Sequence, residues 1–316
     1  MKKINWGIVG YASIAKESGI PAILDSKHSH LYALASQDEE EIQEARIKEP
    51  FDRIYGSYEE LLEDRDVHAV YIPLPNSLHK EWTVKALEKG KHVLCEKPLG
   101  LTEDEVVHMM KRAEEQDRLL MEGFMYRYTP RIQKVMEIVD SGVLGEIRHI
   151  EASFRFMMEE EGDIRMDKDL GGGALYDVGS YGVNFLTLLM KKEPISILGT
   201  KKVEEGVDVQ STVLFEYENG VTAVIHSGFN SFEKNEAEII GTQGRLVIPD
   251  PFLYNDGTIT LYVEGKKEDI YVEPCEKFTE EFEDFSVSIL DGKLPLLSLA
   301  ETRMNARILD RIFAVI

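Results

Sequence analysis

The chain has 316 residues, of which 43% are hydrophobic and 30% are charged, an ordinary composition for a globular protein with room for two domains. Its 36 basic and 58 acidic residues leave a formal charge of −22, which repels phosphate backbones and anionic bilayers, so we expect no nucleic-acid or membrane partner. Because it has only two cysteines and no segment typical of a signal sequence or a membrane span, we expect a cytoplasmic protein.

Short apolar runs alternate with amphipathic stretches over the first third of the chain. The apolar runs predict buried strands, and the spacing of apolar residues between them predicts helices. The strands are expected at 4–9, 31–36, 67–73, 92–95 and 119–124, and the helices at 13–24, 39–47, 77–88 and 103–115. This alternation predicts an α/β fold that begins with a doubly wound parallel sheet.

Beyond about Tyr126, strand-like runs follow one another and Asn219-Gly220 predicts a type I′ hairpin. A largely antiparallel open sheet in an α+β domain is therefore expected. We divide the chain into domains 1–122 and 123–316, with the C-terminal helix packing back on the first domain. The expected strands are 147–156, 211–217, 221–228, 237–240, 245–248, 258–263 and 270–272, and the helices 132–138, 177–190, 278–290 and 299–316, the last capped by Ser298.

A turn of small residues joins the first strand to the first helix. Gly10, Ala12 and Ala15 occupy the three positions of the G-x-G-x-x-G/A pattern, in which a tight turn lets the backbone and the helix N-terminus approach a pyrophosphate. The alternative is that the small side chains only allow the strand and the helix to pack closely. The residues predicted to bind a dinucleotide here are Gly10, Tyr11, Ala12, Ser13 and Ile14.

The second strand ends at Ser36 and Gln37, where a dinucleotide-binding domain contacts the adenosine ribose. An acidic residue there favours NAD and an arginine favours NADP. The chain has neither at the tip, although Asp38 follows and Lys16 or Arg46 could supply a positive charge. An ordinary loop with Asp38 as a helix cap is an equal alternative, so NAD and NADP both remain possible cofactors.

Two more turns follow strands of the same predicted sheet. Pro75, Asn76 and His79 come after the third strand, and Glu96-Lys97-Pro98 comes after the fourth. Ligands bind beyond the carboxyl ends of parallel strands, so both turns are predicted to contact the cofactor and Lys97 to present its ammonium group there. Asn76 or Ser77 could instead serve only as a helix cap.

Together these turns resemble the glucose-fructose oxidoreductase/inositol dehydrogenase (Gfo/Idh/MocA) family of NAD(P)-dependent enzymes. The resemblance covers nearly the whole chain, and an ordered set of motifs is more specific than any one of them. Beyond the turns above it rests on Glu122-Gly123-Phe124-Met125-Tyr126-Arg127-Tyr128, Gly142-Val143-Leu144-Gly145-Glu146-Ile147, Gly171-Gly172-Gly173-Ala174-Leu175-Tyr176-Asp177-Val178-Gly179 and Gly241-Thr242-Gln243-Gly244.

The resemblance implies a Rossmann domain followed by an α/β domain whose open sheet forms a dimer or tetramer. It implies that Lys97 is the active-site lysine, that Glu96 lies near the nicotinamide ribose, and that Asp177 and Tyr181 are further catalytic groups. Many members have a histidine four residues after the aspartate, whereas this chain has Tyr181. The tyrosine resembles the branch containing glucose-fructose oxidoreductase and dimeric dihydrodiol dehydrogenase.

The residue types fit acid–base chemistry. Asp177 and Tyr181 are one helical turn apart and share a face. A phenol exchanges protons near neutral pH when a cation stands beside it, and Lys97 is the candidate cation. The alternatives are a packed aromatic at Tyr181 and a helix cap at Asp177. Arg127, Tyr128, Asp177 and Tyr181 are predicted to bind the substrate, with Arg155, Arg165 and Tyr176 as weaker candidates, and 157–168 is a candidate lid.

The sequence therefore predicts an NAD(P)-dependent oxidoreductase that acts on a small-molecule sugar, polyol or related hydroxy or carbonyl compound. Hydride would pass between substrate and nicotinamide, with Lys97 and Tyr181 handling the proton. No metal-ligand spacing such as H-E-x-x-H is present, so no metal is expected. Two alternatives stay open: a regulatory protein that binds dinucleotide without turnover, and an enzyme that uses the nicotinamide transiently during elimination or hydrolysis.

Overall fold

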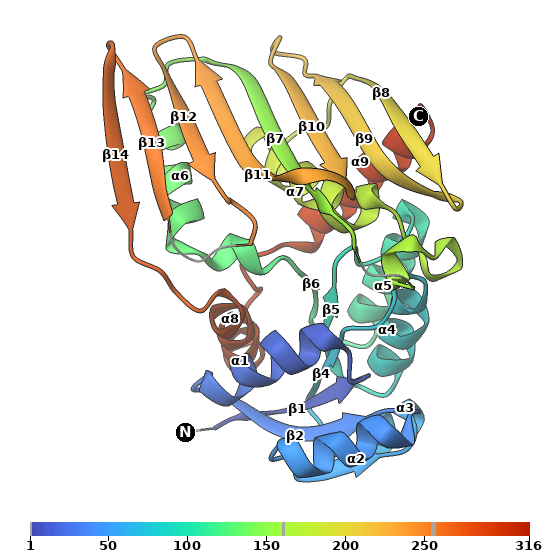
Figure 1. Cartoon of the computed structure of the whole chain (residues 1–316). Helices are drawn as coiled ribbons and strands as arrows, with labels where there is room; N and C mark the ends of the chain where they lie inside the picture. Colours follow the sequence, from blue (N-terminus) through green and yellow to red (C-terminus); the bar gives the residue numbers. More distant parts are fainter. Residues whose placement is uncertain (1, 160–161, 254–256) are drawn as a thin grey trace. The chain divides into compact units, whose positions relative to one another are not determined.

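A computed structural model describes residues 2–159, 162–253 and 257–316, which fall into two compact units (Figure 1). The first unit runs up to Met125 and adds Glu276–Thr302. The second consists of Tyr126–Cys275 and Arg303–Ile316. The chain thus returns to the first unit after completing most of the second.

The first unit is built on a six-stranded parallel sheet in the order β3-β2-β1-β4-β5-β6. Its central strand β1 is buried along almost its whole length, as expected for a sheet covered on both faces. The predicted doubly wound sheet is confirmed, although the short strand β3 was missed. The strands are β1 (Ile4–Val9), β2 (Ser29–Ala35), β3 (Arg53–Tyr55), β4 (Ala69–Ile72), β5 (His92–Glu96) and β6 (Leu120–Gly123).

Helices pack in pairs against this sheet: α1 with α8, and α4 with α5. Residues 13–25 are helical throughout, with a π-helical turn at Ala15–Gly19 before α1. Helix α3, not predicted, is capped by Ser57, whose hydroxyl accepts a hydrogen bond from the Glu60 amide at 3.2 Å. The helices are α1 (Ile20–Asp25), α2 (Glu39–Lys48), α3 (Tyr58–Glu63), α4 (His79–Glu88), α5 (Glu103–Glu115) and α8 (Lys277–Asp291).

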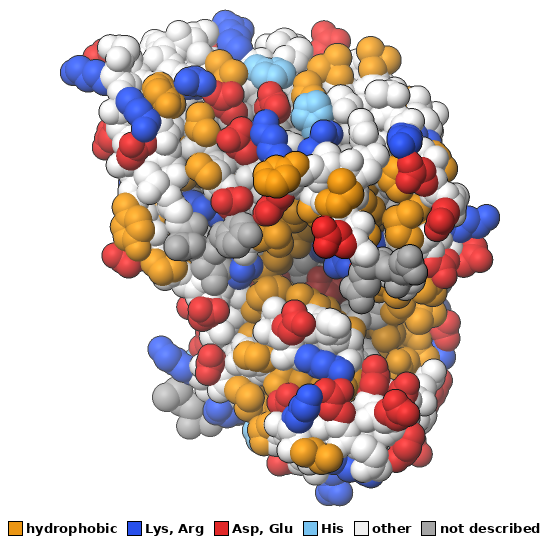
Figure 2. Space-filling view, in the orientation of Figure 1, with side chains coloured by type: hydrophobic (Ala, Val, Ile, Leu, Met, Phe, Trp, Pro, Cys, Tyr) orange, Lys and Arg blue, Asp and Glu red, His pale blue; other side chains and the backbone are white. Residues whose placement is uncertain are grey.

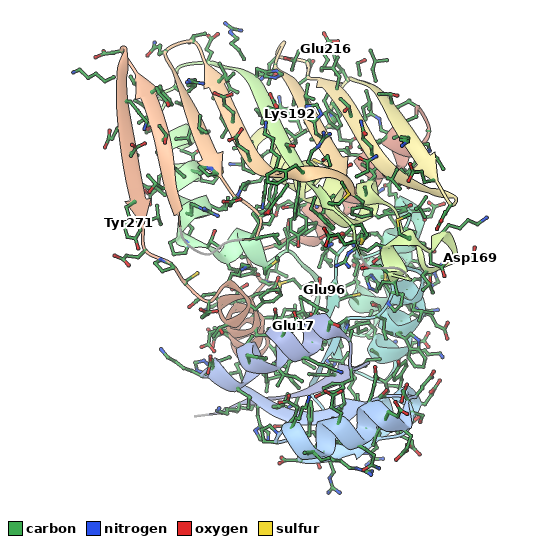
Figure 3. All side chains as sticks on the ribbon, viewed as in Figure 1. Glu17, Glu96, Asp169, Lys192, Glu216 and Tyr271 are labelled. Carbon is green, nitrogen blue, oxygen red and sulfur yellow. The ribbon has the colours of Figure 1, made fainter. Side chains whose placement is uncertain are left out.

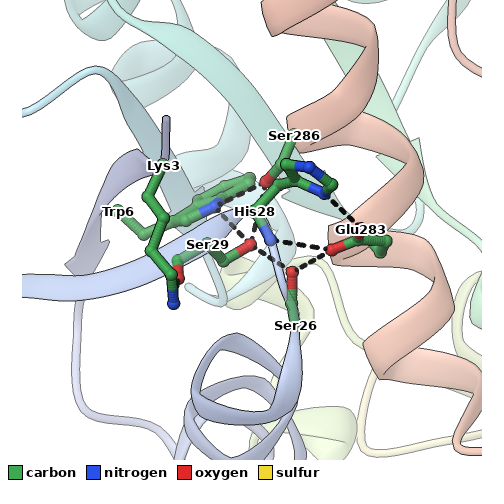
Figure 4. Close-up of polar contacts among 7 residues, drawn as sticks. All are labelled: Lys3, Trp6, Ser26, His28, Ser29, Glu283 and Ser286. Carbon is green, nitrogen blue, oxygen red and sulfur yellow. Dashed lines mark hydrogen bonds and ion pairs between the residues drawn. The ribbon is translucent and has the colours of Figure 1, made fainter. Parts of the chain in front are cut away.

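A polar network attaches α8 to the start of β2 (Figure 4). Glu283 of α8 accepts hydrogen bonds from the Ser26 hydroxyl at 2.6 Å and the His28 amide at 3.0 Å, and the His28 Nδ1 lies 2.5 Å from its other oxygen. Burial opposes ionisation, but these donors hold the pKa of Glu283 below its ordinary value. Trp6 of β1 adds a hydrogen bond to Ser286 at 3.0 Å. A segment distant in sequence thereby completes the first unit.

The second unit is built on an eight-stranded sheet in the order β14-β13-β12-β11-β7-β10-β9-β8. Its strand pairs are antiparallel except β7 with β10, which are parallel. The largely antiparallel sheet is confirmed, and β8 was missed. The strands are β7 (Ile147–Met157), β8 (Ser196–Glu204), β9 (Val207–Glu216), β10 (Thr222–Gly228), β11 (Asn230–Gly241), β12 (Gly244–Pro249), β13 (Gly257–Val263) and β14 (Lys266–Val272).

The turn between β9 and β10 corrects one prediction. The Gly220 amide donates to the Tyr217 carbonyl at 2.8 Å, and the Tyr217 amide donates to the Val221 carbonyl at 2.9 Å. Gly220 has a φ of +77°, whereas Asn219 is not among the described residues with positive φ. The hairpin is confirmed but the type I′ turn is wrong, because that turn needs a positive φ at both central residues.

Helices lie on one face of the second sheet, where α7 contacts β7 and β10 and α6 contacts β14 (Figure 1). They are α6 (Pro130–Asp140), α7 (Ser180–Met190) and α9 (Leu299–Phe313). Ser298 caps α9 as predicted: its hydroxyl accepts from the Glu301 amide at 3.3 Å, and Glu301 accepts from the Ser298 amide at 3.2 Å. Helix α9 begins in the first unit and ends in the second.

Acidic and basic side chains are interspersed over the displayed face rather than gathered in a single patch (Figure 2). Within residues 2–159, 162–253 and 257–316, no helix is long and apolar enough to cross a membrane. The same described residues contain no group of three histidines, cysteines or carboxylates arranged to hold a metal ion.

Candidate active site

The glycine turn after β1 has a backbone conformation that requires glycine at position 10. Gly10 has a φ of +98°, and a Cβ there would lie 2.7 Å from the Leu74 Cδ2 atom, so only glycine fits. Its amide donates to the Ala35 carbonyl of β2 at 2.9 Å, which joins the turn to the neighbouring strand. The helix at 13–25 starts directly afterwards, and the first amides of a helix have no intrahelical acceptor. The turn therefore fits a dinucleotide phosphate.

The tip of β2 places Ser36 and Gln37 in different environments. Ser36 is 1% exposed, and Gln37 is exposed to solvent. Asp38 caps α2 by accepting hydrogen bonds from the amides of Glu40 at 2.7 Å and Glu41 at 3.4 Å. Asp38 is thus observed as a helix cap. Whether Ser36 and Gln37 contact a cofactor is not decided by this cap, and that contact stays a prediction.

The turn after β4 is fixed by the buried side chain of His79. Asn76–Leu78 form a 3₁₀ turn, and α4 begins at His79, whose side chain is fully buried. Its two ring nitrogens lie 2.7 Å from the Leu74 carbonyl and 2.8 Å from the Pro98 carbonyl. Burial lowers the pKa of His79, although both carbonyls act in the opposite direction. His79 thus bridges the two predicted cofactor turns, and its direct contact with a cofactor stays a prediction.

Glu96-Lys97-Pro98 stands at the carboxyl end of β5, where Figure 3 labels Glu96. The peptide bond between Lys97 and Pro98 is cis. The Tyr71 hydroxyl of β4 donates to the Glu96 Oε1 at 2.6 Å. The Leu99 amide donates to the Glu122 Oε1 at 2.9 Å. Neighbouring strands therefore position the residues on both sides of Lys97. Tyr71 was missed because its sequence neighbourhood indicates only a buried strand. Glu122 belongs to a motif on which the resemblance rests, but it was not predicted as a site residue.

A further buried carboxyl lies near Glu96. Glu281 of α8 is 1% exposed and accepts a hydrogen bond from the Phe124 backbone. Burial raises the pKa of Glu281 well above its ordinary value, and the nearby charges of Glu96 and Asp284 add to the shift. The predicted helix at 278–290 contains Glu281, but helical spacing alone did not identify this buried acid.

In the second unit, three glycines precede the helix that carries Asp177 and Tyr181. A Cβ on Gly172 would lie 2.4 Å from the Arg165 carbonyl oxygen, and a Cβ on Gly173 would lie 2.4 Å from the Asp208 Oδ1. The amides of Gly172 and Gly173 donate to the carbonyls of Asp167 and Arg165, each at 2.8 Å. The glycines thus allow the segment at 163–170 to pack against the start of the helix.

Asp177 lies within a π-helical turn, Leu175–Gly179, that runs directly into α7. The predicted start of this helix at 177 is therefore late, and the N-cap alternative for Asp177 is wrong, because the N-cap is Ala174. The Arg165 Nε donates to the Asp177 Oδ2 at 2.9 Å. The charge of Asp177 is the largest cause of the raised pKa of Arg165, although burial opposes it. Among the weaker candidates, Arg165 thus contacts a predicted catalytic group.

Asp208 of β9 fixes the start of this helix from outside it. The Asp208 carboxylate is 6% exposed and accepts the Leu175 amide at 2.8 Å. Burial raises the pKa of Asp208 to about 6, and the hydrogen bond from Leu175 opposes the shift. Asp208 was not predicted from the sequence, since a lone aspartate before a strand carries no local signal.

Tyr181 belongs to an aromatic cluster in the second unit. Its side chain is 5% exposed, and its ring lies 5.5 Å from Phe252, 5.6 Å from Phe154 and 5.9 Å from Tyr126. Packing against aromatics, the alternative for Tyr181, is therefore observed. It fixes the ring without excluding a role for the hydroxyl, because buried tyrosines combine an apolar body with a polar end.

Arg127 and Tyr128, two predicted substrate residues, are both 7% exposed. Asn184 of α7 accepts hydrogen bonds from the Tyr126 hydroxyl at 2.5 Å and from the Arg127 Nη1 at 3.4 Å. Asn184 was another residue that the sequence did not single out. Of the candidate lid at 157–168, residues 160–161 lie outside the described residues, and 164–166 and 168–170 form 3₁₀ turns.

The predicted residues thus form two groups. The first unit holds Gly10, Tyr11, Ala12, Ser13, Ile14, Ser36, Gln37, Pro75, Asn76, His79, Glu96 and Lys97, and the second holds Arg127, Tyr128, Asp177 and Tyr181. Within the first unit, the group follows the carboxyl ends of β1, β2, β4 and β5, where an open α/β sheet binds its ligand.

Comparisons with known proteins agree with this arrangement. Residues 4–124 match an oxidoreductase family with an NAD-binding Rossmann fold, and residues 132–247 match the GFO/IDH/MocA C-terminal domain. Over 314 residues the chain is 34% identical to D-xylose 1-dehydrogenase (NADP(+)) 2 of Haloferax volcanii, covering 98% of this chain and 96% of the relative. It is 28% identical over 323 residues to trans-1,2-dihydrobenzene-1,2-diol dehydrogenase of Xenopus tropicalis, with 96% of both chains covered.

Among solved structures, a 3-ketoreductase from Actinomadura kijaniata in complex with NADP and TDP-benzene superimposes with a TM-score of 0.94. The two proteins are 30% identical, and the match covers 99% of this chain and 98% of the ketoreductase. The chain belongs to the GFO/IDH/MocA family. It is an NAD(P)-dependent oxidoreductase with a Rossmann domain and a mostly antiparallel second domain.

Proposed function

We propose that the chain interconverts a hydroxyl and a carbonyl group on a sugar or polyol, with Lys97 and Tyr181 handling the proton on the reacting oxygen. The observation that carries the proposal is the supported position of Lys97 after β5. Tyr71 anchors Glu96 on one side of the lysine, and Glu122 anchors Leu99 on the other. Such fixed surroundings are what an acid–base or orienting group requires.

Nicotinamide, when bound, supplies or accepts the hydride. The residues of the chain bind the cofactor, orient the substrate and transfer the proton. The turn from Gly10 to Ile14 would bind the pyrophosphate, with Ser36, Gln37, Pro75 and Asn76 contacting other parts of the dinucleotide and Glu96 the nicotinamide ribose. In this proposal Lys97 orients and polarises the substrate oxygen, and Tyr181 gives or takes its proton.

Asp177 has a supporting role in the proposal. Its carboxylate receives the Arg165 guanidinium at 2.9 Å and shares a helix with Tyr181. Asp177, Arg127 and Tyr128 would bind the hydroxyl groups of the substrate and hold the reacting carbon in place. The charged donors and acceptors suit a polyhydroxylated ligand, since each hydroxyl can both donate and accept.

The relatives support two parts of the proposal: a sugar substrate, and a joint role of a lysine and a tyrosine. Their names include a D-xylose dehydrogenase and a 3-ketoreductase acting on a dTDP-linked sugar. The Actinomadura ketoreductase has also been crystallised with a lysine changed to alanine and with a tyrosine changed to phenylalanine, each with NADP and TDP-benzene. Those two residues are separated along the chain by the same number of positions as Lys97 and Tyr181.

We also propose that domain 1–122 binds the cofactor and domain 123–316 binds the substrate. The open sheet of the second domain would join copies of the chain into a dimer or tetramer. A cytoplasmic location fits the two cysteines and the acidic composition.

The test is turnover by Lys97→Ala and Tyr181→Phe, followed through the absorbance of the reduced nicotinamide with NADH and NADPH on a panel of sugars and polyols. Each variant is expected to lose about 10²–10⁴-fold in kcat/KM while it still binds NADH and unfolds at the wild-type temperature. Lys111→Ala is the matched control, because that side chain is 72% exposed on α5.

Two outcomes would contradict the proposal. A wild-type protein that binds dinucleotide but oxidises or reduces no compound in the panel would be a sensor. A cofactor that stays bound through purification and is not consumed in proportion to product would show transient use of the nicotinamide.

A further inference from the structure

The ribose end of the dinucleotide site carries a carboxylate that does not come from the strand tip. The Ser36 hydroxyl, buried directly after β2, donates to the Glu41 Oε2 at 2.5 Å. The same Ser36 oxygen accepts from the Asp38 amide at 3.1 Å. With a donor on one side and an acceptor on the other, the serine holds Glu41 in a single orientation.

Glu41 reaches this point because of how α2 begins. Asp38 caps the helix, and Glu41 stands in its first turn, where the helix dipole favours negative charge. A side chain in the first turn can return to the residues before the cap, as in a capping box. Here it returns to Ser36, the last residue of the β2 tip, and places an acid where the strand itself supplies none.

The end of β2, to which Ser36 binds Glu41, lies next to the glycine turn. The Gly10 amide is bonded to the Ala35 carbonyl at 2.9 Å, so the end of β2 and the turn are adjacent. Burial chiefly raises the pKa of Tyr58, and the charge of Glu41 adds to the shift. The Tyr58 hydroxyl in turn lies 3.7 Å from the position that a Cβ on Gly10 would occupy. Glu41 is therefore held at the end of β2, next to the glycine turn, where a dinucleotide-binding domain contacts the adenosine ribose.

The cations of this region are already engaged by another acid. Lys16 lies 2.7 Å from Glu44 and 4.2 Å from the centre of the Tyr11 ring, and Lys48 also lies 2.7 Å from Glu44. The hydrogen bonds from Lys16 and Lys48 lower the pKa of Glu44 to about 2. Arg46 is exposed on α2. Among the described residues on this side, Glu41 is therefore held by Ser36, whereas Lys16 and Lys48 are paired with Glu44.

We propose that Glu41, anchored by Ser36, selects NAD over NADP. A carboxylate accepts hydrogen bonds from the ribose hydroxyls of NAD, whereas it repels the 2′-phosphate of NADP. The proposal rests on the dinucleotide binding established above and goes beyond it, since several relatives carry or name NADP. The discriminating acid comes from the first turn of α2 instead of the strand end.

The test measures binding alone, by calorimetric titration of the purified chain with NADH and with NADPH at one fixed salt concentration. Wild type is expected to bind NADH at least 10–100-fold more tightly, roughly the worth of charge-assisted hydrogen bonds to a ribose. Glu41→Gln keeps an acceptor for Ser36 but removes the charge, so it should weaken NADH, strengthen NADPH and reduce the ratio about tenfold or more.

Glu40→Gln is the matched control, because Glu40 is exposed in the same helical turn and its side chain does not contact Ser36. The ratio of its affinities for NADH and NADPH should stay within about twofold of the wild-type ratio. Ser36→Ala is a second test. It keeps the charge of Glu41 but removes the hydrogen bond that holds its carboxylate, so the preference for NADH over NADPH should also become smaller. Thermal unfolding establishes that each variant is folded.

The inference fails if wild type binds NADPH as tightly as NADH, or if Glu40→Gln and Glu41→Gln change the ratio equally. A loss of NADPH binding in Lys16→Ala would then identify Lys16 as a phosphate ligand. None of these outcomes depends on which substrate is turned over or on Lys97, so they leave the proposed function standing. Binding of neither nucleotide would instead contradict the cofactor assignment itself.

Discussion

At the scale of single residues, the first unit buries an acid that lowers its own stability. Glu281 of α8 is buried near Glu96, and its Oε1 has no hydrogen-bond partner among the described residues. Burial first, and then the charges of Glu96 and Asp284, raise its pKa well above the ordinary 4.5. The folded chain therefore binds a proton there that the unfolded chain releases as the pH rises above about 4.5.

Glu281→Gln is predicted to stabilise the protein increasingly at higher pH. Because the folded pKa lies above the unfolded value, the contribution of Glu281 to stability is fully present below pH 4.5 and is lost as the pH rises to its folded pKa. The variant lacks this loss, so the difference in free energy of unfolding should grow by about 1.4 kcal/mol per pH unit over that range. Urea unfolding at several pH values measures it.

The control for Glu281 is Glu280→Gln, an exposed position on the same helix. Its unfolding free energy should follow the wild type at every pH. A Glu281→Gln variant whose stability runs parallel to the wild type from pH 4 to pH 8 would show that Glu281 is not protonated in the folded state.

At the scale of elements, the helix with Asp177 and Tyr181 depends on an acid outside it. A helix leaves its first amides without intrahelical acceptors. Here Asp208 of β9 accepts the Leu175 amide, and Gly173 has a φ of +118° with no room for a Cβ beside that carboxylate. The glycine run and the buried acid together determine where the helix starts.

Asp208→Asn is predicted to remove a pH-dependent loss of stability between about pH 4 and pH 6. The folded pKa of Asp208 is about 6, raised from 3.8 mainly by burial, so its contribution to stability is present below pH 3.8 and lost by pH 6. Asparagine still accepts the Leu175 amide. The variant should therefore gain about 3 kcal/mol relative to wild type on going from pH 4 to pH 7.

Asp169→Asn serves as the control, because Asp169 is exposed in the segment beside the glycine run. Chemical denaturation across the same pH range compares the two variants. If Asp208→Asn instead loses stability equally at all pH values, the carboxylate is ionised in the folded state and contributes through its charge.

At the scale of the whole molecule, the second sheet exposes a small apolar patch at its β8 side. Along β9, Val213 and Phe215 are fully buried, whereas Leu214 between them is 41% exposed. Leu198 of β8, 62% exposed, pairs with Leu214, and Val224 of β10 pairs with it on the other side. Side chains that alternate along a strand place these three on the open face.

Leu214→Lys is predicted to dissociate the proposed homo-oligomer. A charge in the middle of an apolar contact leaves both copies with an unpaired buried group, which costs several kcal/mol. Sedimentation equilibrium should show a lower mass for the variant than for the wild type. Ile47→Lys, which changes an 84% exposed residue in the first unit, should keep the wild-type mass. A monomeric wild type would refute the proposed assembly.

Sequence reasoning recovered the two architectures because their signals are local. Buried parallel strands are apolar in unbroken runs, and the turn at Gly10 needs small residues whatever surrounds it. It missed β3, α3 and β8. β3 has only three residues, and β8 is exposed along most of its length, so neither presents a buried periodic face.

The sequence by itself determined the fold class and predicted the dinucleotide turn and the position of Lys97 after a strand, because each depends on residues close together in the chain. Only the tertiary structure decided what holds those residues. Tyr71 supports Glu96 across 25 positions, and Asp208 supports Leu175 across 33. Hydrogen bonds between distant segments form where strands and helices pack, and no local pattern records which carboxylate will meet which donor.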